Sequence, residues 1–441
     1  MSTNRMKVDV NGLKEGMFVA DLDRPWHETP FPLQGFYIRQ DDDIQALAGY
    51  CKYVFVDVKK QKVKSTYAAH AGFSPVKKTP RQQSEEHASL KLPPIVIKSP
   101  AIHEVSSSIQ KEVVKAKKLH AHVYEAIDAV FSGLENGSEI SVQETERVAV
   151  GMVESIIRNP DAMVWLAKMN ENDAHTYRHS VNASIWALVF GRHLGLDKKR
   201  LKTLAMGVLL SHIGKVKLDL DLLERADSLV GRDLETYQSY VGLGVEMLAE
   251  IEGLSPGVNA IVQYHQERHN GSGFPSGVTG DRIPLLAKIA GLVDYYQYLI
   301  TPRKSQQGQS PLEAVSSVYE LRNIAFQKDL VEKFIEAVGV YPTGTLVELS
   351  SAEVGIVTGH NQKRRLQPTV MIVLDPSKKP LKAGRLVDLM EYNRGRKDSQ
   401  GLFIRESLPK GAYDIDETQF LLTGAKSKWS WQHLKGSLAA G

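Results

Sequence analysis

The sequence predicts a mainly α-helical protein, with a helical bundle between a small N-terminal α/β unit and a small β-rich C-terminal appendage. Apolar residues recur at helical spacing from about residue 102 to about residue 338. Before this stretch, and again after Tyr341-Pro342, the pattern changes to short runs of β-branched and alternating residues, which indicate strands. The chain of 441 residues is long enough for two or three such parts, each with its own core.

The first unit covers residues 1–61 and is expected to be a small α/β domain. Its predicted elements are strands over residues 7–10, 17–20, 35–38 and 53–57, and a short helix over residues 41–49 with Asp42 or Asp43 near its start. Residues 62–100 are rich in Lys, Ser, Gln and Pro, a composition typical of a flexible linker.

Helical patterns then follow one another along the chain. A connecting segment, residues 101–140, is predicted to hold one helix from about Ile102 to Leu134. Ser141 and Glu144 have the spacing of a capping box, which opens the bundle of residues 141–345. Strands are expected over residues 346–349, 354–357 and 369–374, within an appendage and tail that cover residues 346–441.

Composition excludes several classes of protein. A formal net charge of +4 is too small over this length to indicate nucleic-acid binding. Cys51 is the single cysteine, so no internal disulfide can form and a reducing cytoplasm fits. The N-terminus has no apolar run of the kind found in signal peptides, and no stretch approaches the roughly 18 apolar residues of a membrane span. The sequence therefore predicts a cytoplasmic protein without a membrane span.

The stretch from Tyr264 to Pro275, YHQERHNGSGFP, contains the most specific motif in the chain. It resembles the signature of HD-GYP proteins, a branch of the HD phosphohydrolase superfamily, which reads roughly His-His-Glu-x-x-Asp-Gly-x-Gly-Tyr-Pro. The resemblance runs from about Asp173 to Arg303 and continues more weakly to Leu349. The segment with Trp26 and Phe36 is similar to the N-terminal domain often found ahead of HD-GYP domains. The resemblance implies an HD-type helical bundle and a role in bacterial cyclic-di-GMP signalling.

The resemblance also implies a set of site residues. Members of the family hold two divalent metals, whose bridging hydroxide attacks a phosphodiester. His179, His265 and Asp294 keep the family residue types, but four positions differ: Ser211 and His212 stand where the namesake His-Asp pair is expected, Tyr240 where a His is expected, and Gln266 where the second His of the loop is expected. An imidazole offers one lone pair and cannot bridge two metals as a carboxylate does.

We therefore expect no metal pair and no bound cofactor. The alternative is a single divalent ion, Fe, Mn or Ni, for which imidazole and carboxylate are suitable ligands. Its candidate ligands are His175, His179, His212, His265 and Asp294.

Other family positions imply contacts to a ligand or to a partner protein. Lys215, Arg268 and Arg303 match or lie near cations that contact substrate phosphates in the family, although surface pairing explains Lys215 and Arg303 equally well. The loop residues Gly271, Ser272, Gly273, Phe274 and Pro275 are a candidate contact for a partner protein, and the alternative for this loop is a structural turn.

Two functions stay open. The first is a non-catalytic regulator, which binds cyclic di-GMP without cleaving it, or binds partner proteins such as diguanylate cyclase (GGDEF) domains through the glycine loop. The second is a metal-dependent cyclic-di-GMP phosphodiesterase with an unusual site that holds as few as one metal. The four replaced positions favour the first function, because serine, glutamine and tyrosine are poor or uncommon metal ligands and the imidazole of His212 cannot bridge two metals.

Overall fold

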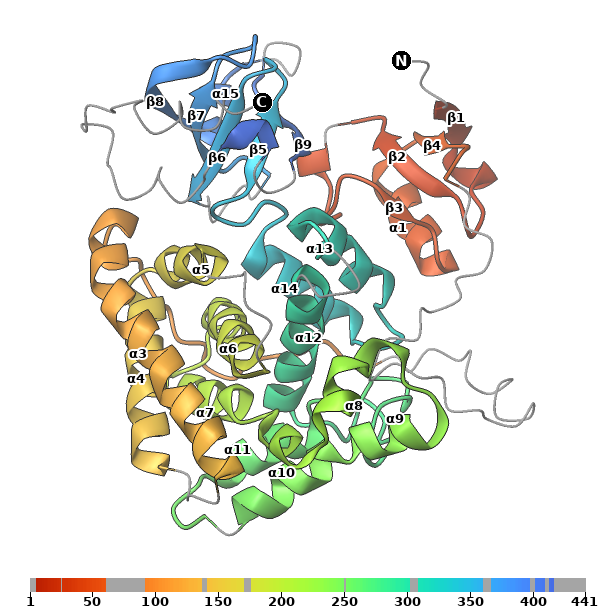
Figure 1. The fold of residues 1–441 in the computed structure, drawn as a ribbon. Coiled ribbons are helices and arrows are strands. Elements are labelled where there is room, and N and C mark those ends of the chain that lie inside the picture. Colours follow the sequence, from red (N-terminus) through yellow and green to blue (C-terminus); the bar gives the residue numbers. More distant parts are fainter. Residues whose placement is uncertain are drawn as a thin grey trace, which may run out of the picture.

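The computed structural model describes residues 5–24, 26–60, 92–136, 141–169, 176–249, 251–301, 308–359, 366–396, 401–408 and 412–415. A helical bundle forms most of the molecule, and two small sheets lie at its upper side in Figure 1, the C-terminal sheet on the left and the N-terminal sheet on the right. The predicted fold class is confirmed.

The N-terminal sheet is antiparallel, with strand order β1-β4-β2-β3. Its elements are β1 Arg5–Asp9, β2 Phe18–Leu22, β3 Phe36–Tyr37, α1 Asp41–Tyr50 and β4 Tyr53–Asp57. All four predicted strands and the helix are present, although β3 is shorter than expected. Trp26, Phe31 and Phe36 are buried and pack together, with ring centroids 5.2–6.4 Å apart, so aromatic side chains supply much of this small core.

Twelve helices, among the described residues, build the bundle and its connections. They are α3 Ile109–Glu135, α4 Val142–Arg158, α5 Pro160–Met169, α6 Thr176–His193, α7 Lys198–Leu209, α8 Leu220–Glu224, α9 Gly231–Gln238, α10 Tyr240–Ala249, α11 Pro256–Tyr264, α12 Leu285–Ile300, α13 Pro311–Glu320 and α14 Lys328–Val338. Helix α6 packs against α7 and α12, and its apolar residues lie in the main hydrophobic core.

The start of α3 differs from the prediction. The helix begins at Ile109, not near Ile102, because the Ser108 side chain caps it by accepting from the Lys111 N–H. The backbone amides of Ser106 and Ser107 donate instead to the Arg158 carbonyl. Ile102 is 89% exposed, so its apolar side chain does not belong to the buried face of the helix.

The predicted capping box at the start of α4 forms only in part. Ser141 accepts from the Glu144 N–H as expected, but the Glu144 carboxylate pairs with His122 at 2.9 Å and with Arg147. A capping box with both of its hydrogen bonds occurs at the start of α13, between Ser310 and Glu313.

The predicted linker, residues 62–100, lies mostly outside the described residues. Its described end, residues 92–100, forms neither helix nor strand, but it is held against the start of α14. Gln327 donates to the Pro93 carbonyl at 3.0 Å, and the Ile95 N–H donates to Asp329 at 2.5 Å. This end of the segment is therefore attached to the bundle.

The C-terminal sheet is antiparallel, with strand order β8-β7-β6-β5-β9. Its elements are β5 Leu346–Leu349, β6 Val354–Gly359, β7 Thr369–Leu374, β8 Pro380–Asp388, α15 Leu389–Asn393 and β9 Ile404–Ser407. The three predicted strands are confirmed as β5, β6 and β7. The tail, residues 416–441, lies outside the described residues.

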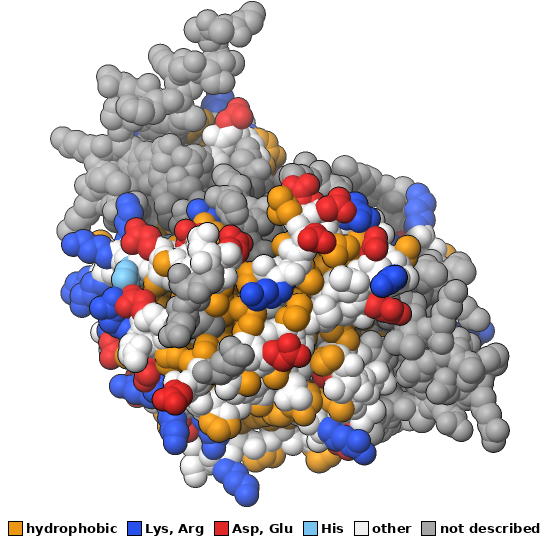
Figure 2. All heavy atoms as spheres, turned by 60° about the horizontal axis from the view of Figure 1, so that its bottom comes forward, with side chains coloured by type: hydrophobic (Ala, Val, Ile, Leu, Met, Phe, Trp, Pro, Cys, Tyr) orange, Lys and Arg blue, Asp and Glu red, His pale blue; other side chains and the backbone are white. Residues whose placement is uncertain are grey.

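The face at the bottom of Figure 1 is turned forward in Figure 2. Lysines, arginines and carboxylates are interspersed there, with apolar side chains between them. The part of this face drawn in colour offers no continuous basic band of the kind that nucleic-acid-binding proteins present. Among the described residues, no helix is both long enough and apolar enough to cross a membrane.

Candidate functional site: a buried histidine–carboxylate network

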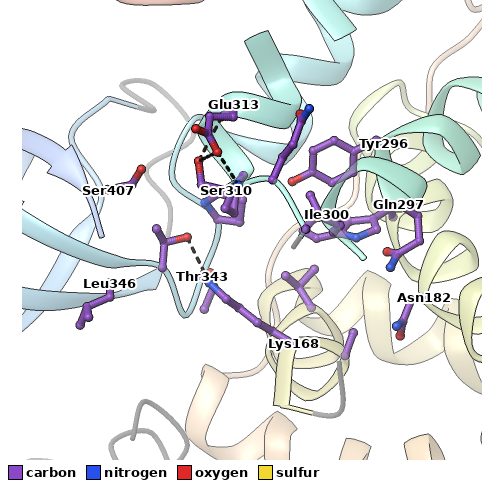
Figure 3. A pocket seen from close by; sticks show the side chains of 18 of the residues that line it. Lys168, Asn182, Tyr296, Gln297, Ile300, Ser310, Glu313, Thr343, Leu346 and Ser407 are labelled. Carbon is purple, nitrogen blue, oxygen red and sulfur yellow. Dashed lines mark hydrogen bonds between the residues drawn. The ribbon is translucent and has the colours of Figure 1, made fainter. Parts of the chain in front are cut away.

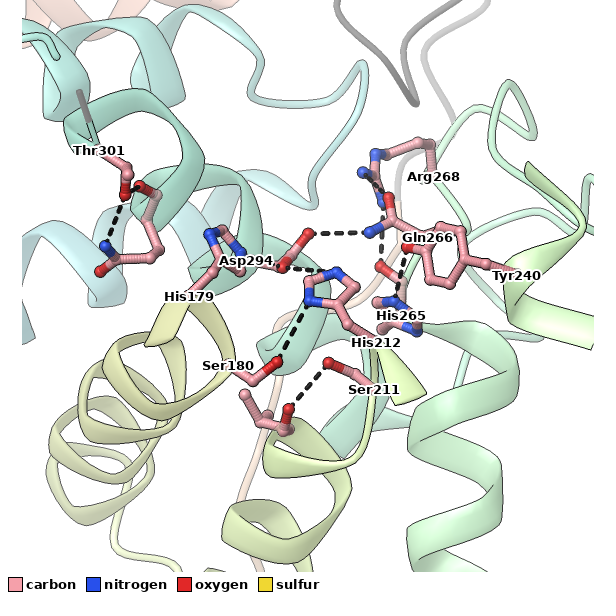
Figure 4. A network of polar contacts seen from close by, with 12 residues as sticks. His179, Ser180, Ser211, His212, Tyr240, His265, Gln266, Arg268, Asp294 and Thr301 are labelled. Atoms are coloured by element: carbon pink, nitrogen blue, oxygen red, sulfur yellow. Dashed lines mark hydrogen bonds and ion pairs between the residues drawn. The ribbon is translucent and has the colours of Figure 1, made fainter. Parts of the chain in front are cut away.

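The bundle brings most of the predicted site residues together (Figure 4). His179 comes from the first turn of α6, Asp294 from α12, and His212 from the turn that follows α7. Tyr240 begins α10, and His265 and Gln266 follow the end of α11. His175 and Arg303 lie outside the described residues, so their expected roles stay predictions.

Asp294 is the centre of the network. His179 Nε2 lies 2.7 Å from Asp294 Oδ1, and His212 Nε2 lies 3.3 Å from the same oxygen. Gln266 Nε2 donates to the other oxygen, Oδ2, at 2.8 Å. Burial by itself raises the pKa of Asp294, but His212 and His179 outweigh it and hold that pKa well below its usual range. The carboxylate is therefore ionised at neutral pH.

His212 is neutral. Burial, assisted by nearby Lys215, lowers the pKa of His212 well below its ordinary value. Ser180 Oγ lies 3.3 Å from His212 Nδ1. The hydrogen bonds are consistent with one tautomer, in which Nδ1 accepts from the Ser180 hydroxyl and Nε2–H faces Asp294.

His265 and Tyr240 form a second buried pair beside Asp294. The Tyr240 hydroxyl lies 3.1 Å from His265 Nε2, and His265 Nδ1 lies 2.8 Å from the Val262 carbonyl. Burial lowers the pKa of His265 to about 4 and raises the pKa of Tyr240 well above its ordinary value. Both side chains are therefore neutral at pH 7, and Nε2 of His265 is already engaged as an acceptor.

Ser211 is buried but bonds away from this network. Its hydroxyl donates to the Val208 carbonyl at 2.8 Å, one turn back in α7. This local bond is common for serine at the end of a helix.

The predicted cations differ in their surroundings. Arg268 is 2% exposed, and its guanidinium donates to the His265 and Glu267 carbonyls and to Gln266 Oε1 at 2.8–3.1 Å. These donors hold the loop together, and the expected contact of Arg268 with phosphates stays a prediction. Lys215 is half-buried, with its ammonium 4.9 Å from the Tyr240 ring centroid.

The glycine loop is tightly built. A Cβ on Gly273 would lie 2.4 Å from both Gln266 O and Glu267 Cα, so only glycine fits there. Gly271 has a φ of +76°, which also favours glycine. Phe274 is buried, with its ring 6.1 Å from that of Tyr240, whereas Pro275 is exposed. Of the five loop residues expected to contact a partner protein, Gly273 and Phe274 are therefore buried in contacts within the protein.

Glu267 is a structural residue of the site that the sequence analysis did not identify. The residue is 4% exposed. Its carboxylate accepts hydrogen bonds from three successive backbone amides, those of Ser276, Gly277 and Val278, at 2.7–3.1 Å. Glu267 directly follows Gln266 and occupies the Glu position of the HD-GYP signature, so the sequence pattern could have identified it.

We expect Glu267→Gln to destabilise the loop by about 1–3 kcal/mol, because the new NH₂ group faces a partly buried backbone amide and leaves it unpaired. Hydrogen exchange of the amides of residues 276–278 measures this effect. The conservative variant Asp281→Asn, at an exposed position of the same segment, is the control. Unchanged exchange in Glu267→Gln would contradict the assignment.

The described residues can hold one metal ion. One ligand atom each from His179, His212 and Asp294 lies within 4.8 Å of the others, and two imidazoles with one carboxylate suit Fe or another borderline divalent ion. His212 would have to change tautomer, with Ser180 becoming the acceptor. The described residues offer no ligand set for a second metal, because Ser211 bonds to α7, Gln266 is a poor ligand, and His265 is paired with Tyr240.

Comparisons with known proteins place this geometry in a family. Residues 164–325 match the HD domain, and residues 5–145 match a domain of unknown function, DUF3391. The chain therefore contains an HD domain, preceded by a DUF3391 domain. The predicted resemblance is confirmed, and the DUF3391 match extends beyond the small α/β unit through the linker and α3.

Relatives of this HD domain protein include a cyclic di-GMP phosphodiesterase of Pseudomonas aeruginosa, 26% identical over 87% of this chain and 88% of the relative. The cyclic di-GMP phosphodiesterase PdeB of Borreliella burgdorferi is 22% identical over 49% of this chain and 55% of its own length. A solved HDG"Y"P protein from Bdellovibrio bacteriovorus, 18% identical, covers 75% of this chain and 98% of its own, with a TM-score of 0.43. The chain is thus homologous to cyclic-di-GMP phosphodiesterases.

Proposed function

We propose that this HD domain protein is a non-catalytic regulator of cyclic-di-GMP signalling that binds the nucleotide without cleaving it. The supporting observation is the state of Asp294, whose two oxygens face His179, His212 and Gln266 at 2.7–3.3 Å. Three side chains compensate the buried charge, which in a two-metal hydrolase is compensated by the metals.

We infer that no second metal is bound, and this has a direct consequence for catalysis. A pair of metals activates the attacking hydroxide and also stabilises the leaving oxygen. Besides the two histidines that face Asp294, the groups around this carboxylate include a neutral amide, Gln266, and a neutral tyrosine–histidine pair. Neither the amide nor the tyrosine–histidine pair supplies the positive charge of a second metal that the transition state needs, so binding can persist where turnover does not.

A hydrolase with one metal is the second candidate, and one observation favours it. His179, His212 and Asp294 present a two-histidine, one-carboxylate set. A single ion held there would lower the pKa of a bound water and supply a nucleophile.

Metal analysis and turnover distinguish the two functions. Protein purified without a metal-binding tag should contain well under one equivalent of Fe, Mn or Ni, and should release no linear dinucleotide from cyclic di-GMP when these metals are supplied. Turnover should be at least ~10³-fold below that of the Pseudomonas aeruginosa relative assayed alongside, in line with the loss of metal catalysis.

The control is Asp294→Ala, which removes the carboxylate of the three-ligand set. Metal-dependent cleavage by the wild type that this variant abolishes would establish the one-metal hydrolase. If cyclic di-GMP neither binds nor is cleaved, the exposed part of the glycine loop remains the candidate contact for a partner such as a GGDEF domain.

A further inference from the structure

The C-terminal end of α13 forms a contact between the bundle and the N-terminal sheet domain (Figure 1). This end of the helix packs against strand β3 of that domain. The ring of Tyr319 lies 5.9 Å from that of Phe36, and the Glu320 carboxylate pairs with the Arg39 guanidinium. Charged side chains therefore supply part of this contact, as they do in interfaces between domains that can separate.

A buried ion pair extends the contact into the turn that follows α13. Arg322 of this turn donates to Asp43 of α1 at 2.6 Å, and both side chains are buried. The same guanidinium donates to the Tyr319 carbonyl at 2.9 Å. A buried guanidinium is unfavourable without its carboxylate, so the position of Arg322 depends on the docking of α1.

The turn itself is a compact unit, because its own hydrogen bonds close it. The Leu321 carbonyl accepts from three amides, those of residues 324–326, at 3.0–3.2 Å. The Asn323 N–H donates to the Phe326 carbonyl at 2.7 Å. A displacement of Arg322 therefore moves the carbonyls of the following residues with it.

The other side of this turn holds the signature loop. The carbonyls of residues 324 and 325 accept from the amides of Asn270 and His269 at 3.0 and 2.9 Å. The ring of Phe326 lies 5.5 Å from the guanidinium carbon of Arg268. The turn is thus bound to the N-terminal domain on one side and to the loop on the other.

The loop connects this turn to the histidine–carboxylate network. Arg268 donates to Gln266 Oε1 at 2.8 Å, and Gln266 Nε2 donates to Asp294 at 2.8 Å (Figure 4). A series of contacts therefore leads from α1 of the N-terminal domain to the central carboxylate of the site.

Helix α13 can shift as a unit. Its start has a complete capping box, in which the Glu313 carboxylate accepts from Ser310, so the first turn keeps its shape (Figure 3). The same turn lines a cavity of about 600 Å³ between the bundle and the C-terminal sheet. A space of this size leaves the helix room to move, which a close-packed interface would not.

We propose that the N-terminal domain regulates the signature loop. While it is docked on α13, it holds the loop in place through residues 319–326, and when it undocks, the loop loosens. By linkage, a ligand that orders the loop also favours docking of the domain. This inference concerns how the loop is held, so it does not depend on whether the site binds or cleaves cyclic di-GMP.

The test is hydrogen exchange of the His269 and Asn270 amides in the full chain. Arg39→Glu places a second carboxylate beside Glu320, and the repulsion between like charges should undock the domain. Exchange of the two amides should become about tenfold faster or more, because their acceptor carbonyls are no longer held in place. Combining Arg39→Glu with Glu320→Arg restores an ion pair in the reverse order and should return the exchange to the wild-type rate.

Arg5→Glu is the matched control. It also places a carboxylate beside a carboxylate of the N-terminal sheet, that of Asp21, but in an exposed pair, and it should leave both amides unchanged. The amide of Met152, a buried residue in the middle of α4, reports any general loss of stability and should keep its wild-type rate in every variant.

Two results would overturn the inference. One is unchanged exchange of the His269 and Asn270 amides in Arg39→Glu. The other is faster exchange that appears equally in Arg5→Glu or at Met152, since it would come from general destabilisation. Circular dichroism shows whether each variant is folded. If Arg39→Glu does not fold, the milder Arg39→Met, which only removes the ion pair, is judged by the same criteria.

Discussion

Arg322→Met should lower the free energy of unfolding by about 3–5 kcal/mol, because it leaves the Asp43 carboxylate buried without its cation. Arg322 donates to Asp43 at 2.6 Å, and the two side chains are 1% and 4% exposed. The pair joins α1 of the N-terminal sheet domain to the turn between α13 and α14. Urea denaturation, followed by both fluorescence and circular dichroism, measures the change.

A double replacement tests the cause. Asp43→Leu combined with Arg322→Met should recover most of the lost stability, since well-packed apolar residues often replace a buried ion pair at little cost. Arg225→Met, which breaks an exposed pair with Asp221, is the control and should leave the unfolding curve unchanged within error. A double variant as unstable as Arg322→Met would show that the pair acts through shape, and not through charge.

This pair matters for the site because the same short segment contacts the signature loop. Tyr319 packs against Phe36 of the N-terminal sheet, with ring centroids 5.9 Å apart, and Glu320 pairs with Arg39. A few residues later, the carbonyls of Ile324 and Ala325 accept from the amides of Asn270 and His269. One segment, residues 319–325, thus connects the N-terminal domain to the loop that carries Arg268 and Gly273.

Patterns within a few neighbouring residues were enough to predict several of the strands. Residues 53–57 and 369–374 alternate or are β-branched, and the strands β4 and β7 have the predicted bounds. The start of α3 was placed too early, because Ile102 and Val105 continue the apolar spacing although both are exposed. Periodicity does not show where a cap interrupts a helix, and the three consecutive serines at residues 106–108 were the available signal.

The sequence predicted which residues come together at the site, but it did not predict which of them contact one another. The spacing of the motifs placed His179 and Asp294 together, and the structure brings them within hydrogen-bond distance. Arg268 was expected to face a ligand, because it lies in the signature loop and cations near this loop contact substrate phosphates in the family that the sequence resembles. Its burial depends on the backbone path around Gly273, which sequence alone does not reveal. The cavity beside the start of α13 was missed because segments far apart in the chain form its walls.

Stability should fall by about 3 kcal/mol between about pH 7 and pH 4 through His120 alone. Burial, with a contribution from Arg178, lowers the pKa of His120 from 6.5 to about 4. Below pH 6.5 the unfolded chain gains a proton at this residue that the folded protein does not take up until about pH 4. The unfolded state therefore binds more protons in this window, and stability is lost as the pH falls. The lowered pKa of His265 acts in the same direction.

Urea denaturation at a series of pH values measures this slope in the wild type and in His120→Phe. The phenylalanine keeps an aromatic ring against Tyr124, which lies 4.7 Å from the imidazole between centroids, and it removes the titrating group. Its stability should therefore decline less steeply between about pH 6.5 and pH 4, by about 3 kcal/mol over the window. Val114→Phe, which places an aromatic ring at an exposed position of the same helix and removes no titrating group, is the control and should keep the wild-type slope. Equal slopes in wild type and His120→Phe would show that the pKa of His120 does not differ between the folded and unfolded protein, which would contradict the lowering by burial.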